Sequence, residues 1–167
     1  MVALRFASLF LLYTSLTVLA TKLPSRAAAA KGPTPPPLNT WAENALATVI
    51  KATSVSALDT AFDAFLSQDV TIAVNAMSLS RADYIAKRQS QGFDTAAKIV
   101  YSQALEAPTV ANSSAAGEVA LYFVATIGAN VVTSSMNLVI GQDTTLSPPL
   151  TDSRRVNSIN QILTETS

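Results

Sequence analysis

The sequence of 167 residues contains no cysteine and no histidine. Without cysteine the chain has no disulfide framework, no thiolate-bound metal and no cysteine nucleophile. Without histidine it has no Ser-His-Asp triad, no histidine-ligated zinc and no imidazole to transfer protons near pH 7. Only five glycines are present, and they form no glycine-rich phosphate loop. We therefore expect neither a metal site nor a cofactor.

Charged residues are also scarce, at 13% of the chain against 49% hydrophobic residues. A disordered chain shows the opposite balance, so the composition predicts a folded domain. Eleven basic residues match eleven acidic residues. A net charge of zero disfavours a nucleic-acid-binding protein, because such proteins neutralise phosphates with an excess of lysine and arginine.

The first 20 residues have the pattern of a secretory signal peptide. Arg5 precedes an apolar run from Phe6 to Leu19, and Ala20 ends a Val-Leu-Ala sequence suited to cleavage. A membrane anchor is the alternative, but a spanning helix needs ~20 apolar residues and this run is shorter. We predict cleavage after Ala20 and a secreted, extracellular protein without membrane contact.

Residues 21–38 are rich in proline and alanine, with prolines at 33 and 35–37. Proline fixes φ and lacks an N–H, so this segment is expected to be extended polyproline II rather than folded core. A propeptide or a ligand for a proline-binding module is the alternative. We interpret the segment as a disordered linker and place the folded domain at residues 39–167.

Three segments, 40–51, 57–67 and 81–91, have the apolar spacing of amphipathic helices. At each start a Ser or Thr is followed three residues later by an acidic residue, which is the spacing of a capping box. These pairs are Thr40 and Glu43, Ser56 and Asp59, and Ser80 and Asp83. Gly92 is suited to the C-terminal glycine position of the third helix.

The remaining segments alternate apolar and polar residues as strands do. The predicted strands cover residues 70–74, 77–79, 98–107, 118–127, 131–141 and 154–163. Residues 118–127 are apolar on both faces, which predicts a central strand. The order of elements predicts an α+β fold in which N-terminal helices pack in a curved antiparallel sheet.

This order, together with the stretch VTIAVNAMSLSRADY from Val70 to Tyr84, resembles the NTF2-like (SnoaL-like) cone fold between about Trp41 and Glu165. A signal peptide before a small cysteine-free domain is similar to uncharacterised secreted NTF2-like proteins of fungi. The resemblance implies a pocket between the sheet and the helices. The family includes ketosteroid isomerase-like enzymes, polyketide cyclase-like enzymes, dehydratases and non-enzymatic binding proteins.

Two functions are compatible with this resemblance. The first is a non-catalytic domain that binds a small apolar molecule or a partner in the pocket. Apolar walls with a few orienting polar groups are typical of small-molecule sites. The candidate ligand-binding residues are Tyr101, Tyr122, Met136 and Asn137.

The second is a histidine-free lyase or isomerase that uses an Asp as base and a Tyr as hydrogen-bond donor to an oxyanion. Asp69 and Asp83 are the candidate bases, and Tyr84, Tyr101 and Tyr122 are the candidate donors. Asp83 is better explained as a helix-capping residue and Asp69 as a surface residue between helix and strand, so binding is the favoured function.

Asn112 begins the sequence Asn-Ser-Ser, which is the acceptor pattern for N-glycosylation. The segment around it is polar, so we predict a glycosylated surface loop. The outward-facing residues of the predicted sheet are Ser, Thr, Asn and Gln with some Val and Ile. A face of this kind predicts a monomer or a weak homodimer.

Overall fold

The computed structural model describes residues 35–111, 113–145 and 152–166. The predicted signal peptide, the linker up to residue 34 and Asn112 lie outside these residues. The described part contains the helices α1 (Leu38–Ile50), α2 (Val55–Phe65) and α3 (Arg81–Ser90), and the strands β1 (Leu66–Val74), β2 (Met77–Leu79), β3 (Lys98–Pro108), β4 (Gly117–Ile127), β5 (Asn130–Gln142) and β6 (Arg154–Thr166). Each predicted helix and strand is present, and the α+β fold class is confirmed.

The strands form one curved sheet in the order β2-β1-β6-β5-β4-β3. The sheet is mixed, because β1 pairs in parallel with β6 while all other pairs are antiparallel. The prediction of an entirely antiparallel sheet was wrong at this pair. Strands that follow one another in sequence usually pair by a turn, but β1 also pairs with β6, from which it is separated in sequence by α3 and four strands.

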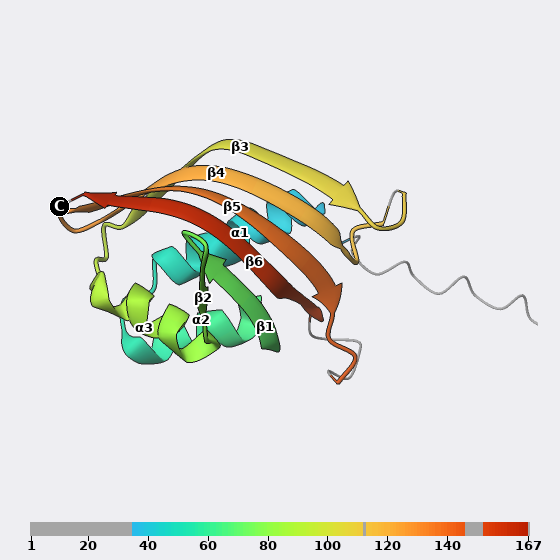
Figure 1. The fold of residues 1–167 in the computed structure, drawn as a ribbon, viewed down its shortest axis with the longest axis horizontal. Coiled ribbons are helices and arrows are strands. Elements are labelled where there is room, and N and C mark those ends of the chain that lie inside the picture. The colour runs from blue at the N-terminus through green and yellow to red at the C-terminus, as the bar shows by residue number, and fades with distance from the viewer. Residues whose placement is uncertain (1–34, 112, 146–151, 167) are drawn as a thin grey trace, which may run out of the picture. The chain divides into compact units, whose positions relative to one another are not determined.

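The helices lie on the concave side of the sheet (Figure 1). Helix α1 contacts β3 and β4, α2 contacts β1 and β6, and α3 contacts β1 and β2. The core between these layers includes Phe62, Phe65, Phe123 and Met136, each at most 2% exposed. In this part of the chain no helix combines the length and apolarity needed to cross a bilayer.

Strand β4 is buried on one face only, although its sequence predicts burial on both. Leu121 and Phe123 point into the core, whereas Tyr122 between them is 43% exposed. None of the helices that the structure describes covers the outer face of the sheet (Figure 1). The apolar residues on that face therefore remain in contact with solvent, and β4 lies next to the edge strand β3 rather than at the centre.

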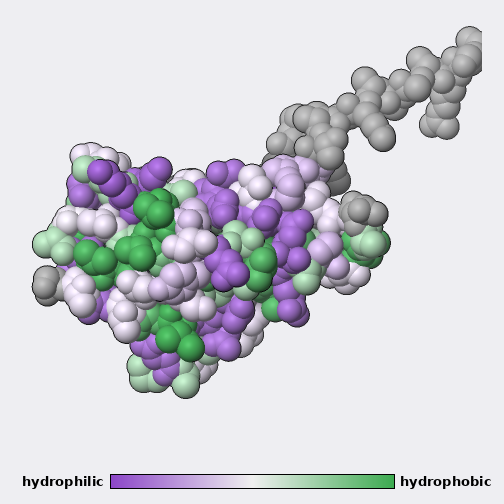
Figure 2. All heavy atoms as spheres, turned by 90° about the horizontal axis from the view of Figure 1, so that it is seen from above, coloured by the Kyte–Doolittle hydropathy of each residue, from purple (hydrophilic) through white to green (hydrophobic). Residues whose placement is uncertain are grey.

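The outer face of the sheet mixes apolar and polar side chains. Its exposed apolar residues include Val100, Leu105, Tyr122, Val139 and Ile162. Tyr122 pairs with Ser135 and Val139 pairs with Ser158 and Glu118, so polar residues separate the apolar ones. Figure 2, which views the molecule from above the sheet of Figure 1, shows hydrophobic residues in separate groups among hydrophilic ones.

Helix α1 begins two residues earlier than predicted. Leu38, assigned to the linker from the sequence, is its first residue and is buried. No side chain caps this N-terminus in the predicted way, because Thr40 already lies within the helix. Instead the backbone N–H of Asn39 donates to Glu106 Oε2 on β3 at 2.9 Å. A carboxylate from another element thus takes the place of the local cap.

Helix α2 is capped by Ser54 rather than by the predicted Ser56, and it begins correspondingly earlier. Helix α3 has the predicted cap, in which the Asp83 N–H donates to Ser80 Oγ at 3.0 Å and Ser80 Oγ donates to Asp83 Oδ2 at 2.6 Å. Gly92 follows α3 with φ +80°, as expected for a C-terminal glycine. Capping patterns in this sequence therefore identified the helices but misplaced two of their starts.

The turn between β1 and β2 uses two residues with positive φ, Asn75 at 50° and Ala76 at 64°. This is the backbone of a type I′ turn, which favours Asn and Gly. The Asn75 side chain also extends the parallel pairing with β6. Its Nδ2 donates to Leu163 O at 3.0 Å, and Leu163 N donates to its Oδ1 at 2.9 Å.

Replacing Ala76 with glycine is expected to stabilise the domain by about 0.5–1 kcal/mol, because glycine adopts positive φ without the steric cost that Ala76 has. Urea unfolding measures the change. The matched control is Ala86→Gly on the exposed side of α3, where glycine is expected to cost about 1 kcal/mol. Destabilisation by both substitutions would contradict the interpretation of the turn.

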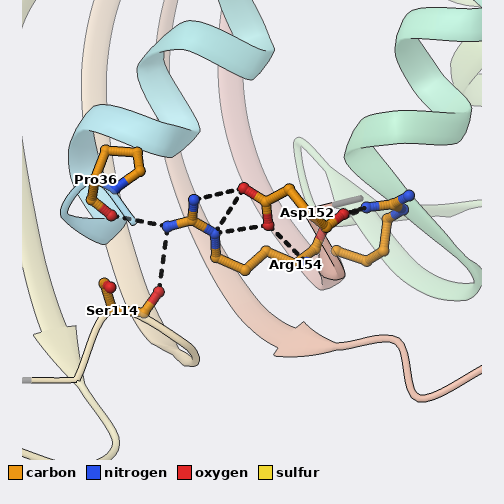
Figure 3. Close-up of polar contacts among 5 residues, drawn as sticks. Pro36, Ser114, Asp152 and Arg154 are labelled. Carbon is orange, nitrogen blue, oxygen red and sulfur yellow. Dashed lines mark hydrogen bonds and ion pairs between the residues drawn. The ribbon is translucent and has the colours of Figure 1, made fainter. Parts of the chain in front are cut away.

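A buried arginine at the start of β6 forms hydrogen bonds to several chain segments (Figure 3). Arg154 is 3% exposed, and its Nε donates to Asp152 Oδ1 at 2.9 Å. Its Nη1 donates to Pro36 O at 2.8 Å and to Ser114 O at 3.2 Å. The guanidinium carbon lies 5.3 Å from the centroid of the Trp41 ring. The segment before α1, the β3–β4 loop and the start of β6 are thus joined through one side chain.

Candidate functional site

A cavity of about 40 Å³ lies between the three helices and the inner face of the sheet. A buried water needs roughly 10–15 Å³ measured in this way, so the cavity accommodates a group of a few non-hydrogen atoms. Its apolar wall consists of Leu46, Val49, Ile50, Phe62, Phe123, Val132, Met136 and Leu163. Its polar residues are Tyr84, Lys87, Arg88, Gln91 and Gln161.

Helix α3 and its C-cap residue Gln91 supply four of the polar residues. Tyr84, Lys87, Arg88 and Gln91 are spaced at i, i+3, i+4 and i+7, which places them on one face of a helix. This face points toward the cavity, although the Lys87 side chain on it is still 37% exposed. The amphipathic pattern of α3 is therefore unusual, because its inward face contains two basic residues.

Gln161 reaches the cavity because β6 contains a bulge. Val139 pairs with Ser158 and Ile140 pairs with Val156, so one extra residue, Asn157, lies in β6. Such an insertion changes which side chains face inward on the two sides of it. Beyond it, Gln161 is buried at 4% exposure.

Tyr84 and Gln161 form a buried chain of hydrogen bonds beside the cavity. Tyr84 Oη donates to Gln161 Oε1 at 3.0 Å, and Gln161 Nε2 donates to Ser134 Oγ at 2.9 Å. Ser134 Oγ donates in turn to Ile162 O at 3.3 Å. Burial raises the pKa of the Tyr84 phenol. The phenol therefore stays protonated at ordinary pH and acts as a donor, not as a base.

Replacing Tyr84 with phenylalanine is expected to lower the free energy of unfolding by about 1–2 kcal/mol, because the buried Gln161 Oε1 loses its donor. Chemical denaturation measures the loss. Tyr122→Phe removes the same hydroxyl from the exposed outer face and is expected to change stability by less than about 0.5 kcal/mol. Equal effects of the two substitutions would contradict a buried network around Tyr84.

Arg88 places a positive charge beside the cavity and is only 5% exposed. Its Nη1 donates to Gly92 O at 2.8 Å and its Nη2 donates to Ile50 O at 2.7 Å. These carbonyls lie at the C-terminal ends of α3 and α1, where a positive charge is favourable. Its Nε has no partner among the described residues. Burial lowers the Arg88 pKa, but a guanidinium remains charged in proteins.

The other basic residue, Lys87, is paired with Glu165 near the end of β6. Lys87 Nζ lies 3.2 Å from Glu165 Oε1, and both side chains are 37% exposed. Gln91 Nε2 donates to the same oxygen at 2.7 Å. Lys87 and Gln91, which both line the cavity, therefore bind the same oxygen of the partly exposed Glu165 carboxylate.

The structure does not bring the four candidate ligand-binding residues together. Met136 is buried and lines the cavity. Tyr101 is half-buried on the inner face, but its hydroxyl donates to Glu43 O at 2.7 Å, away from the cavity. Tyr122 and Asn137 are exposed on the outer face. Successive residues of a strand point to opposite faces, so Asn137 and its neighbour Met136 cannot share one pocket.

The two candidate bases also lie outside the cavity. Asp69 is exposed on β1, and Asp83 is exposed where it caps α3. Of the candidate hydrogen-bond donors, only Tyr84 lines the cavity. In the ranges that the structure describes, no Asp or Glu lines the cavity, and no group of acidic residues is arranged to hold a metal ion.

Sequence analysis did not identify Lys87, Arg88, Gln91 or Gln161 as site residues. Helical spacing could have pointed to Lys87, Arg88 and Gln91, because they follow the predicted site residue Tyr84 on the same helix face. Basic residues on a helix are ordinarily assigned to solvent, and only the packing of α3 shows that this face is turned inward.

No protein-family model and no curated protein matches the sequence. Solved structures do match. An NTF2-like protein of unknown function from Pseudomonas aeruginosa superposes with a TM-score of 0.50 at 13% identity, covering 77% of this chain and 94% of that chain. The fold is NTF2-like.

Other structures with similar coverage include a conserved protein from Planctomyces limnophilus, with a TM-score of 0.50, 5% identity and coverage of 77% of this chain and 95% of that chain. A proposed ketosteroid isomerase from Kribbella flavida has a TM-score of 0.44, 15% identity and coverage of 77% and 82%. At these identities the similarity concerns the NTF2-like fold alone. The predicted fold is confirmed, and the function has to be argued from the cavity itself.

Proposed function

We propose that this chain is a secreted, non-catalytic binding protein whose NTF2-like domain holds a small, mainly apolar molecule in the cavity between α1, α2, α3 and the sheet. The composition of the cavity wall carries this proposal. Eight apolar side chains surround the space, and the polar groups are held by hydrogen bonds to protein atoms. Concave, largely apolar sites with few fixed polar groups are typical of small-molecule binding.

The same wall argues against the lyase or isomerase alternative. Abstraction of a proton needs a base within hydrogen-bond reach of the substrate. The sequence has no histidine, and among the described residues no carboxylate lines the cavity. The ionisable groups that do line it are the Tyr84 phenol, Lys87 and Arg88. The phenol donates a hydrogen bond, and the two basic side chains carry positive charge, which supports binding rather than proton abstraction.

Native mass spectrometry of the protein purified from its own source tests the proposal. A molecule that co-purifies and leaves on unfolding is the expected result, since the apolar wall favours an occupant over water. Incubation of the released molecule with fresh protein is the matched control, and its mass is expected to remain unchanged. Conversion to a product, or protein that carries and takes up no small molecule, would contradict the proposal.

Secretion belongs to the same proposal and rests on residues outside the described part of the chain. Sequencing of the mature protein from culture medium is expected to begin at Thr21. A membrane-bound form that retains Met1 would contradict it.

Glycosylation at Asn112 is part of this proposal as well. The sequon follows β3 in a segment where Thr109 N donates to Ala116 O at 3.0 Å, closing the loop. Enzymatic removal of N-glycans is expected to lower the mass of the secreted protein, and Asn112→Gln is expected to abolish that change. An unchanged mass for the unmodified sequence would contradict glycosylation.

We also expect a monomer or a weak homodimer in solution. The exposed apolar side chains of the sheet are separated by polar ones (Figure 2), and stable interfaces need a continuous complementary surface. Sedimentation at increasing protein concentration measures the association, and a dimer that persists at nanomolar concentration would contradict this expectation.

A further inference from the structure

The polar side of the cavity is arranged for a negatively charged group. Lys87 and Arg88 on α3 and Gln91 at its C-cap all line the cavity, and all three side chains can donate hydrogen bonds. In the described part of the chain no carboxylate lines the cavity beside them. A neutral apolar ligand would leave the Arg88 charge beside an apolar surface without a counter-charge, which is unfavourable.

Arg88 is held in place independently of any ligand. Its Nη1 and Nη2 donate to the carbonyls of Gly92 and Ile50, so little side-chain freedom remains to be lost on binding. No carboxylate of the described residues forms an ion pair with it. The positive charge of Arg88 is therefore fixed in position but not neutralised by a carboxylate. The Arg88 Nε also lacks a hydrogen-bond partner among these residues.

The neighbouring donors already bind a carboxylate. Glu165 Oε1 accepts from Gln91 Nε2 at 2.7 Å and lies 3.2 Å from Lys87 Nζ. This contact shows that Lys87 and Gln91 are spaced to hold one carboxylate oxygen between them. Because the Glu165 side chain is 37% exposed, a ligand carboxylate can compete with it at modest cost.

We propose that the cavity binds a small monocarboxylate, with its carboxylate at Lys87, Gln91 and Arg88 and its apolar body among Leu46, Phe62, Phe123 and Met136. This inference rests on the proposed binding function and names the chemical class of the ligand. The cavity volume of about 40 Å³ suits a body of a few carbon atoms, given roughly 10–15 Å³ for each water-sized group.

Butyrate and butyramide are the probes, since they have the same shape and differ in charge. Titration of the full mature chain is followed by the backbone amide signals of α3 and β6 in NMR spectra. Butyrate is expected to bind with a Kd of about a millimolar or below, in keeping with the affinity that six non-hydrogen atoms can supply. Butyramide is expected to bind at least about tenfold more weakly, because it lacks the charge.

Two substitutions near the proposed carboxylate position test whether ligand binding depends on charge. Both leave Arg88 and its hydrogen bonds to Gly92 and Ile50 unchanged. Glu165→Gln removes the competing carboxylate and is expected to tighten butyrate binding about threefold or more while leaving butyramide unchanged. Lys87→Met removes a cation and is expected to weaken butyrate binding about tenfold. Equal affinity of both probes, or no gain for butyrate in Glu165→Gln, would overturn the proposal.

Two adjacent positions on β6 test whether the ligand binds in the cavity. Leu163 lines the cavity, and Leu163→Trp is expected to abolish butyrate binding by filling the space. Ile162 is 67% exposed on the outer face, and Ile162→Trp is expected to leave binding unchanged. Retained binding in Leu163→Trp would place the carboxylate elsewhere and overturn the proposal.

The failure of this inference is distinguishable from the failure of the proposed function. If butyramide binds as tightly as butyrate, and Leu163→Trp abolishes the binding of both, the carboxylate inference is overturned. The proposed binding function then still holds. Absence of binding by either probe, together with the absence of any co-purifying molecule, would overturn both.

Discussion

Replacing Arg154 with methionine is expected to lower the free energy of unfolding by about 3 kcal/mol, which is a large part of the stability of an ordinary domain. Arg154 is 3% exposed, and its hydrogen bonds reach Asp152, Pro36 and Ser114 (Figure 3). Methionine fills a similar space but donates nothing. The carbonyls of Pro36 and Ser114 then lose their donor at a partly buried position.

Thermal or urea unfolding of Arg154→Met measures this loss. Arg81→Met is the matched control, because Arg81 also forms an ion pair, with Asp63, but the Arg81 side chain is 21% exposed against 3% for Arg154, and Asp63 is 64% exposed against 46% for Asp152. Exposed pairs contribute less than about 1 kcal/mol. A loss no larger in Arg154→Met than in Arg81→Met would contradict a stabilising role for the buried cluster.

The same cluster predicts an acid-dependent loss of stability. Burial by itself would raise the pKa of Asp152, but the hydrogen bonds from Arg154 outweigh it and hold the pKa below its ordinary value. A carboxyl whose pKa is lowered on folding contributes stability above its unfolded pKa of ~3.9 and loses it as the pH falls through the folded value. Arg154→Met is expected to reduce this part of the acid dependence, because the side-chain hydrogen bonds and charge of Arg154 are lost while the backbone N–H at position 154 still donates to Asp152.

Replacing Gly117 with alanine is expected to cost about 3 kcal/mol, because the added methyl group collides with the backbone rather than with a movable side chain. An ideal Cβ at Gly117 would lie 2.5 Å from Ala107 O and 2.6 Å from Pro108 Cα. It would also lie 2.8 Å from Leu38 Cδ1. Relief of these contacts requires the first residues of β4 to separate from β3 and from the start of α1.

Gly128→Ala is the matched control for this prediction. Gly128 has φ +60°, and nothing lies within 4 Å of its ideal Cβ. Its substitution therefore reports the backbone cost of positive φ alone, about 1 kcal/mol. Denaturant unfolding of the two variants measures the loss of stability in each. A smaller loss of stability in Gly117→Ala than in Gly128→Ala would contradict the steric argument.

The helices and strands could be predicted from the sequence because their signals are local. The cap formed by Ser80 and Asp83 and the alternation of residues 131–141 each depend on neighbours along the chain, and both are present in the structure. The start of α1 could not be predicted in the same way, because Glu106 on β3 binds the N–H of Asn39. A contact between residues so distant in sequence leaves no local pattern.

The site was less predictable than the fold. Met136 and Tyr84 were identified and line the cavity, because each lies on the buried face of its own element. Tyr122 was grouped with them although strand alternation turns it to the outer face. The basic residues of α3 were not identified as site residues, since the direction in which a helix face points depends on the layer against which it packs.

The sequence alone determined the absence of histidine and cysteine chemistry, the order of elements and the resemblance to an NTF2-like fold. The tertiary structure alone decided that β1 pairs in parallel with β6 and that Arg88 and Gln161 meet at one cavity. The physical reason is the range of the interactions. Backbone hydrogen bonding and side-chain periodicity act between near neighbours, whereas a cavity is formed by residues that only the packing of distant segments brings together.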